Sequence, residues 1–163
     1  MIVMKLHSPI LITGIGSPHG DDQVGWEIAK QIQNRDSDLV DIRLARTPDD
    51  LLNWMDNIKQ LVICDACQGA GEVGSFYHWE WPSDRLESIQ WSGTHHVSLP
   101  AILALAKQLG RLPAEVHIWG VEIEHTQPDH AMSDPVLAGA TEVADAICKE
   151  LTIPIKTAGT QHA

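Results

Sequence analysis

Short apolar runs alternate along this chain with segments in which apolar residues recur at helical spacing. The apolar runs predict strands at residues 9–13, 39–45, 61–64, 75–81 and 116–121. The helical segments are residues 23–33, a stretch from Thr47 and Pro48 with Leu51, Met55 and Ile58 on one face, a stretch capped by Ser98, and residues 133–151. Strands that alternate with helices predict an α/β fold whose mostly parallel sheet is covered on both faces.

The turns after the first and third predicted strands carry acidic residues. Asp21 and Asp22 follow the first strand, and Asp65 ends the apolar run of the third. In open parallel sheets, ligands bind beyond the carboxyl ends of the strands, where the strand order reverses. Right-handed crossovers allow the second and third strands to lie on opposite sides of the first. The two turns then face each other, which predicts a site built from carboxylates that are distant in sequence.

The glycine-rich segment from Gly14 to Gly20 admits a different interpretation, a dinucleotide-binding Rossmann-like module. It has one residue too many before its third glycine. Asp21 and Asp22 would also stand where a pyrophosphate needs a helix N-terminus, and their charges would oppose it. The turn therefore suits a cation better, although one of the two acids could simply cap the following helix.

Length and charge narrow the classes of partner. The 163 residues favour one domain, expected at residues 1–151 with a flexible tail at 152–163. A formal net charge of −11 disfavours nucleic acid, and no stretch approaches the roughly 20 apolar residues of a membrane span. We expect a cytoplasmic monomer. Three cysteines give no disulfide framework, and the pair Cys64 and Cys67 is interpreted as small buried side chains, with redox work as the alternative.

Several segments, in order, resemble the hydrogenase maturation endopeptidases. These proteases trim a C-terminal extension from the large subunit of nickel–iron hydrogenases. The similar segments are residues 14–25 around Asp22, residues 47–52, residues 61–66 around Asp65, residues 94–99 around His95, residues 120–124, and residues 133–135. The resemblance covers nearly the whole chain, to about Leu151.

The resemblance implies a fold, an activity and a site. The fold is a three-layer α/β/α sandwich on a five-stranded mixed sheet, in the order 2-1-3-5-4 with strand 4 antiparallel. The activity is metal-dependent hydrolysis of a peptide bond in a hydrogenase large-subunit precursor, of the aspartyl peptidase-like kind. Asp22, Asp65 and His95 are expected to be both the catalytic residues and the metal ligands. The metal is expected to be nickel carried by the substrate, although other divalent ions could occupy the site in vitro.

Three questions stay open at the level of sequence. His19 and His96 lie close enough in sequence to the expected ligands to contact the metal as well. The metal could serve catalysis or recognition alone. The chain could also be a non-catalytic, nickel-dependent checkpoint that docks on the precursor without cutting it.

Overall fold

The structure is a computed structural model, and it describes residues 9–35, 40–91, 97–124 and 131–153. In chain order, the elements are β1 (Ile10–Ile15), η1 (Gly20–Gln23), α1 (Val24–Gln33), β2 (Asp41–Ala45), η2 (Pro48–Asn53), β3 (Gln60–Gln68), β4 (Phe76–Glu80), η3 (Asp84–Ser88), β5 (Gln90–Trp91), α2 (Leu99–Gln108), β6 (Glu115–Glu122) and α3 (Asp134–Glu150). No helix in these ranges is long and apolar enough to cross a membrane.

The main sheet has the strand order β2-β1-β3-β6-β4. β1, β2, β3 and β6 run parallel, and β4 pairs antiparallel with β6. The expected order and the antiparallel fourth strand are therefore confirmed, because β6 is the fifth of the strands predicted from sequence. One short strand was not expected: β5 pairs antiparallel with the end of β3.

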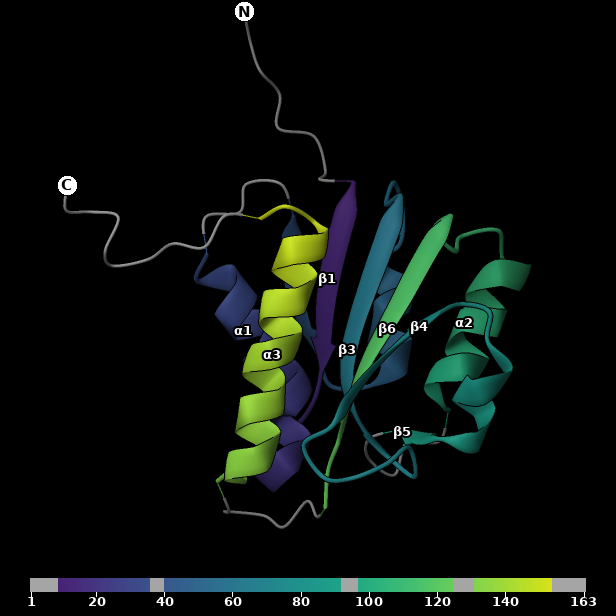
Figure 1. The fold of residues 1–163 in the computed structure, drawn as a ribbon. Helices are drawn as coiled ribbons and strands as arrows, with labels where there is room; N and C mark the ends of the chain where they lie inside the picture. Colours follow the sequence, from purple (N-terminus) through teal and green to yellow (C-terminus); the bar gives the residue numbers. More distant parts are fainter. Residues whose placement is uncertain (1–8, 36–39, 92–96, 125–130, 154–163) are drawn as a thin grey trace, which may run out of the picture.

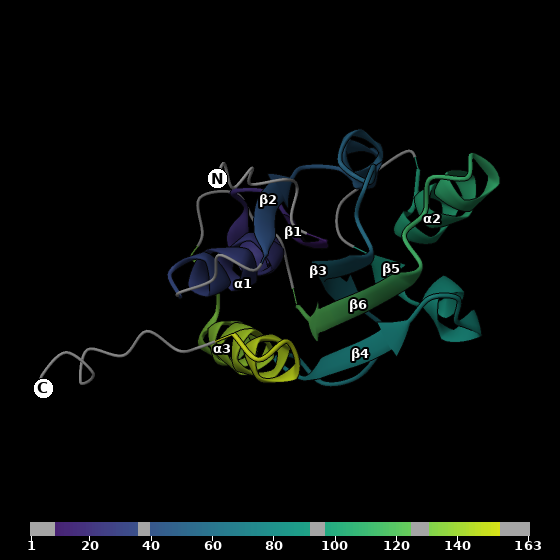
Figure 2. The ribbon, with the colours of Figure 1, turned by 90° about the horizontal axis from the view of Figure 1, so that it is seen from above.

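The helices form a layer on each face of this sheet. α1 and α3 pack against each other on one face, while α2 and η2 lie on the other (Figures 1 and 2). Alternate residues of β3 serve the two layers, as Val62 and Cys64 face the α1/α3 core and Leu61 and Ile63 face the other core. A strand buried on both faces explains why its sequence reads as a continuous apolar run. The three-layer α/β/α sandwich is confirmed.

Two local predictions were wrong. The stretch after Thr47 is a 3-10 helix that ends at Asn53 rather than a longer helix through Ile58. Asn57 has a left-handed backbone, with φ of 65°, which a continuing helix does not allow. Met55 is nevertheless buried. The apolar spacing therefore predicted the burial of this residue correctly but the length of the helix incorrectly.

The third strand is longer than its apolar run. It continues to Gln68 because β6 supplies pairing partners as far as Cys67, and β5 pairs with Cys67 and Gln68. Asp65 therefore lies inside β3, opposite Gly120, instead of ending the strand. Beyond α3, Ile153 is buried in the α1/α3 core, and its N–H donates to the carbonyl of Cys148 at 2.8 Å.

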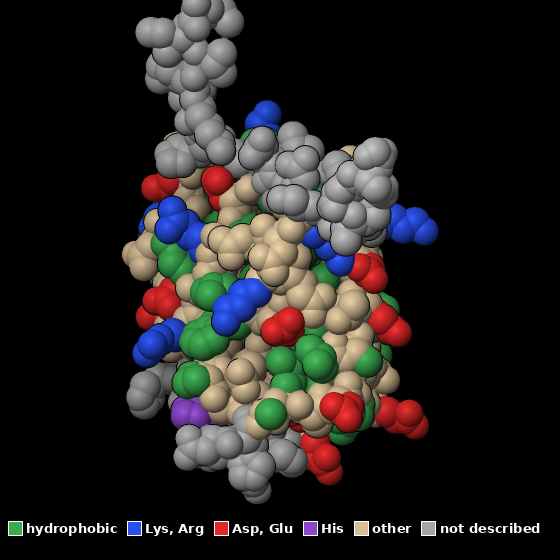
Figure 3. Space-filling model, turned by 90° about the vertical axis from the view of Figure 1, so that its left-hand side faces the viewer, with side chains coloured by type: hydrophobic (Ala, Val, Ile, Leu, Met, Phe, Trp, Pro, Cys, Tyr) green, Lys and Arg blue, Asp and Glu red, His purple; other side chains and the backbone are tan. Residues whose placement is uncertain are grey.

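The acidic excess of the chain does not form one continuous surface over the α1/α3 layer. Lys and Arg side chains stand among the Asp and Glu side chains on that face, with hydrophobic side chains between them (Figure 3). Long-range attraction of a positive partner to this face is correspondingly weak.

Candidate functional site

The turn after β1 is held by its own backbone. The Gly16 N–H donates to the carbonyl of Ala45 in β2 at 3.0 Å, and the Ser17 N–H donates to the carbonyl of Asp22 at 3.3 Å. The Asp22 N–H donates to the carbonyl of His19 at 3.0 Å. Because both ends of the loop are fixed in this way, the position of Asp22 is set by the sheet rather than by a free loop.

Glycine at position 25 brings this turn against β3. A Cβ atom on Gly25 would lie 2.1 Å from the carbonyl oxygen of Ile15 and 2.6 Å from that of Cys64. Both distances are far below van der Waals contact, so no other residue fits without moving the backbone. Asp22 lies three residues before Gly25, and Asp65 directly follows Cys64, so η1, which carries Asp22, and β3, which carries Asp65, are in contact.

Both of these carboxylates are buried. Asp22 is 5% exposed, and its Oδ2 accepts a hydrogen bond from the Ser17 hydroxyl at 2.5 Å. Asp65 is fully buried, and its Oδ1 accepts from the N–H of Ala66 at 2.8 Å. Asp22 lies in η1 and Asp65 in β3, and a buried carboxylate costs free energy unless hydrogen bonds or a cation compensate it.

Asp21 has a structural role that sequence reasoning did not identify. It is 1% exposed, and its carboxylate accepts from the Ser133 N–H at 2.7 Å and the Glu124 N–H at 3.4 Å. These bonds join the β1 turn to the segments that follow β6 and precede α3. Capping explained one of the two adjacent acids in the sequence interpretation. In the structure Asp21 instead binds the backbone of a segment that is distant in sequence. Its role therefore differs from that of Asp22, whose carboxylate accepts from the Ser17 hydroxyl.

His95 and His96 lie outside the described residues, in the gap at 92–96, so the third predicted ligand has no position here. The residues that flank the gap are placed. Trp91 in β5 pairs with Cys67, two positions beyond Asp65. On the other side Ser98 caps α2, and its hydroxyl accepts from the Ala101 N–H at 3.3 Å. His19 is an exposed member of the β1 turn.

A family model for hydrogenase maturation proteases, named HycI, matches residues 27–150 of this chain. The chain belongs to the hydrogenase maturation protease family. Members of this family are peptide-bond hydrolases, and a hydrogenase protein is the implied substrate. The matched segment includes Asp65 and His95, whereas Asp22 lies just before it.

Solved structures of maturation proteases have the same fold. The hydrogenase-maturating endopeptidase HybD from E. coli superposes with a TM-score of 0.70 at 22% identity, over 93% of this chain and 99% of that one. The [NiFe] hydrogenase maturation protease HycI from Thermococcus kodakarensis gives 0.67 at 21% identity, over 89% and 93%. A hydrogenase 3 maturation protease gives 0.70 at 19%, over 87% and 90%. No curated protein matches the sequence.

Glu122 is another buried acid of the protease whose structural role was not predicted from the sequence. It is 5% exposed, and its carboxylate accepts from three successive N–H groups, of Gly69 at 3.0 Å, Ala70 at 2.9 Å and Gly71 at 3.1 Å. Glu122 therefore fixes the turn that follows β3. The available signal was an acid at the end of an apolar strand together with a glycine-rich turn in need of acceptors.

The environment of Cys64 and Cys67 disfavours their thiolate forms. Cys64 and Cys67 are buried in β3 on opposite faces of the sheet. Burial raises the pKa of both thiols, and the carboxylate of Asp65 raises the pKa of each further. Thiolates are the reactive and metal-binding form, so this environment opposes redox or zinc chemistry at the pair.

A pocket of about 470 Å³ lies on the α2 face of the protease. It is bordered by η2, β5 and the start of α2, and the residues that line it include Pro48, Leu86, Trp91, Ser98 and Leu99. Trp91 directly precedes residues 92–96, which include His95, and Ser98 lies two residues after them. The apolar lining suits a short stretch of extended polypeptide.

Proposed function

We propose that this chain is the endopeptidase that removes the C-terminal extension of a nickel–iron hydrogenase large-subunit precursor after nickel has been inserted. The observation that supports it most is that two carboxylates, Asp22 and Asp65, are buried on η1 and β3, which are in contact. In a chain of the maturation protease family, such a pair is the natural place for a metal-bearing substrate to bind.

The donors suit a divalent ion brought by the precursor. Asp22 and Asp65 contribute carboxylate oxygens, and His95 contributes an imidazole nitrogen. Mixed oxygen and nitrogen sets of this kind accept several divalent ions, including nickel. In this proposal the nickel belongs to the substrate, and a precursor without nickel lacks the group that these three residues hold.

The same residues can also assist hydrolysis. A carboxylate held within reach of water can accept its proton as the water attacks the scissile carbonyl. The Ser17 hydroxyl fixes the orientation of Asp22, and the Ala66 N–H fixes that of Asp65. Both acids are therefore positioned before the substrate arrives, which reduces the entropic cost of the reactive arrangement.

The pocket beside β5 provides room for the chain on one side of the cleavage site. Its apolar residues, among them Leu86 and Leu99, would bind hydrophobic side chains of the precursor. This arrangement separates two tasks. The carboxylates bind the metal of the precursor, and the pocket binds the polypeptide next to it.

The alternatives differ from this proposal in specific ways. A dinucleotide module would place a pyrophosphate against Asp21 and Asp22, which are buried acids engaged by Ser133 and Ser17 respectively. Such a site repels phosphate. A checkpoint protein would bind the loaded precursor through the same residues and leave it intact.

Nickel-loaded and metal-free precursor, incubated separately with the purified protein, provide the test. We expect mass spectrometry to show loss of the C-terminal extension from the loaded precursor alone. Equal cleavage of both precursors would contradict nickel recognition. Stable binding of loaded precursor without cleavage would instead establish the checkpoint function.

A further inference from the structure

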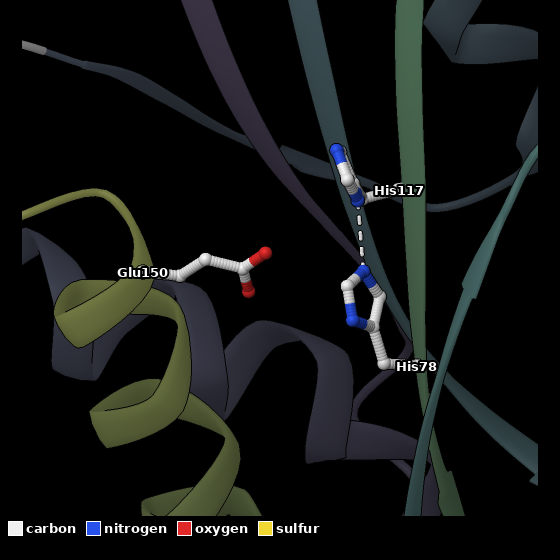
Figure 4. Close-up of side chains that lie close together, drawn as sticks. All are labelled: His78, His117 and Glu150. Carbon is white, nitrogen blue, oxygen red and sulfur yellow. Dashed lines mark hydrogen bonds between the residues drawn. The ribbon is translucent and has the colours of Figure 1, made fainter.

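His78, His117 and Glu150 form a cluster that the proposed function does not use. They come from β4, β6 and the last residue of α3, and their side chains converge (Figure 4). One possible ligand atom from each lies within 4.8 Å of the other two. His117 is buried at the base of the cluster, while His78 and Glu150 are exposed at its mouth.

The cluster is far from the carboxylate pair. α3 begins beside Ser133, whose N–H is bonded to Asp21, and Glu150 ends this helix of 17 residues. At 1.5 Å per residue the helix carries Glu150 about 25 Å away from that turn. The two sets of residues therefore cannot share one ion.

Hydrogen bonds favour one tautomer of His117. Its Nε2 lies 3.4 Å from Oε2 of Glu115, so the carboxylate draws the ring proton to that nitrogen. Nδ1 of His117 then carries the lone pair and faces Nε2 of His78 at 2.8 Å. A carboxylate behind a histidine whose other nitrogen faces inward is the usual outer support of a metal-binding imidazole.

The ring of His78 is also held in place. It stacks on Trp119 with ring centroids 4.1 Å apart and planes 4° from parallel. β4 is an edge strand that pairs only with β6 among the described strands, so small shifts of His78 do not disturb a second ladder. Trp119 therefore sets the orientation of the His78 ring.

We propose that His78, His117 and Glu150 bind a divalent cation of the zinc type, at a site separate from the one that binds the substrate. Two imidazoles and one carboxylate are a known ligand set for zinc with one position left open. Metal–ligand bonds of 2.0–2.1 Å in a tetrahedron separate neighbouring donors by about 3.3 Å. The two facing nitrogens must part by about 0.5 Å, and the exposed Glu150 side chain must close in by rotation.

The local charge supports a cation here. Oε1 of Glu80 lies 3.9 Å from Nδ1 of His117, and Glu115 lies on the other side of the same ring. Three carboxylates thus surround two imidazoles in a chain whose net charge is −11. A bound ion would join the edge strand β4 to the last turn of α3 and stabilise the folded state by mass action.

Untagged protein titrated with Zn²⁺ tests the site. We expect one equivalent to bind at micromolar concentration and to raise the melting temperature. Glu150→Gln removes the charge at an exposed position, and His78→Phe keeps a ring to stack on Trp119 while removing both nitrogens. Each variant should weaken that equivalent at least tenfold and reduce the zinc-dependent shift in melting temperature.

Two controls make the result specific. Glu142→Gln changes another exposed acid of α3 and should leave zinc binding unchanged. Asp65→Asn should leave this equivalent unchanged as well, because it alters the distant carboxylate pair. Affinity that is the same in wild type, Glu150→Gln and His78→Phe would overturn the proposal. Binding only at millimolar zinc would overturn it too.

Discussion

Replacement of Asp65 by asparagine separates a functional carboxylate from a structural one. The side chain is fully buried in β3, and asparagine has nearly the same shape, so the core on both sides of the strand should keep its packing. The Oδ1 atom of asparagine can still accept the hydrogen bond from Ala66 N–H, now 2.8 Å long. The change removes the negative charge and replaces one oxygen by an NH₂ donor that cannot bind a cation.

Opposing terms set the size of the stability change. Removing a buried charge relieves part of its desolvation cost, while the hydrogen bond to a neutral amide is weaker than the one to a carboxylate. Their sum should change the free energy of unfolding by about 1 kcal/mol or less. Loss of a ligand to the metal should reduce the stabilisation of the transition state by several kcal/mol. At 1.36 kcal/mol per decade, about 3 kcal/mol corresponds to a loss of more than 100-fold in processing rate.

Two assays on the same protein are needed. Chemical denaturation gives the free energy of unfolding, and time-resolved mass spectrometry of nickel-loaded precursor gives the rate of processing. Asp21→Asn is the matched control, because Asp21 is equally buried but bonded to the distant Ser133 backbone. It should lower stability while the folded fraction processes precursor normally. Wild-type processing by folded Asp65→Asn protein would show that Asp65 has no part in the site.

The same two assays test the first two of three further expectations, and thiol labelling tests the third. His95→Ala should abolish processing of loaded precursor, whereas His96→Ala should reduce it far less, and equal losses would contradict the choice between them. Glu122→Gln should lower the free energy of unfolding by about 2 kcal/mol, because one of two oxygens that accept backbone N–H groups becomes a donor. Burial raises the pKa of Cys64 and Cys67, so iodoacetamide at pH 8 should label neither thiol until the protein is unfolded. Fast labelling of native protein would contradict this.

The centre of the sheet could be predicted because β1, β3 and β6 are buried on both faces. Continuous apolar runs marked β1, β3 and β6, and helical spacing marked the segments between them. The resemblance to the maturation endopeptidases then supplied the strand order. β5 escaped detection because a strand of two residues carries no periodicity, and its pairing with Cys67 and Gln68 is a tertiary contact.

The carboxylate pair could be expected, but the division of labour among acids could not. Asp21 and Asp22 are adjacent and chemically identical, and both are buried. Only the position of Ser133, more than 100 residues away, shows that Asp21 serves a backbone partner. Glu122 is similar, since its three partners lie in a turn 51 to 53 residues earlier. For Glu122 the sequence offered only an acid at the end of an apolar run and a glycine-rich turn elsewhere, and no local pattern joins the two.

The two candidate metal sites differ in the chemistry of their donors, and this affects how metal binding should be interpreted. The proposed substrate site has two carboxylates, of Asp22 and Asp65, and one imidazole, of His95, whereas the cluster at the other end of α3 has two imidazoles and the carboxylate of Glu150. Nickel and zinc bind more tightly to imidazole than to carboxylate, so free metal added to the isolated protein should fill the site with two histidines first. Nickel binding to the free protein therefore says nothing about recognition of the precursor until it is repeated in the His78→Phe and Glu150→Gln variants. If those variants still distinguish loaded from metal-free precursor, the discrimination comes from the carboxylate pair.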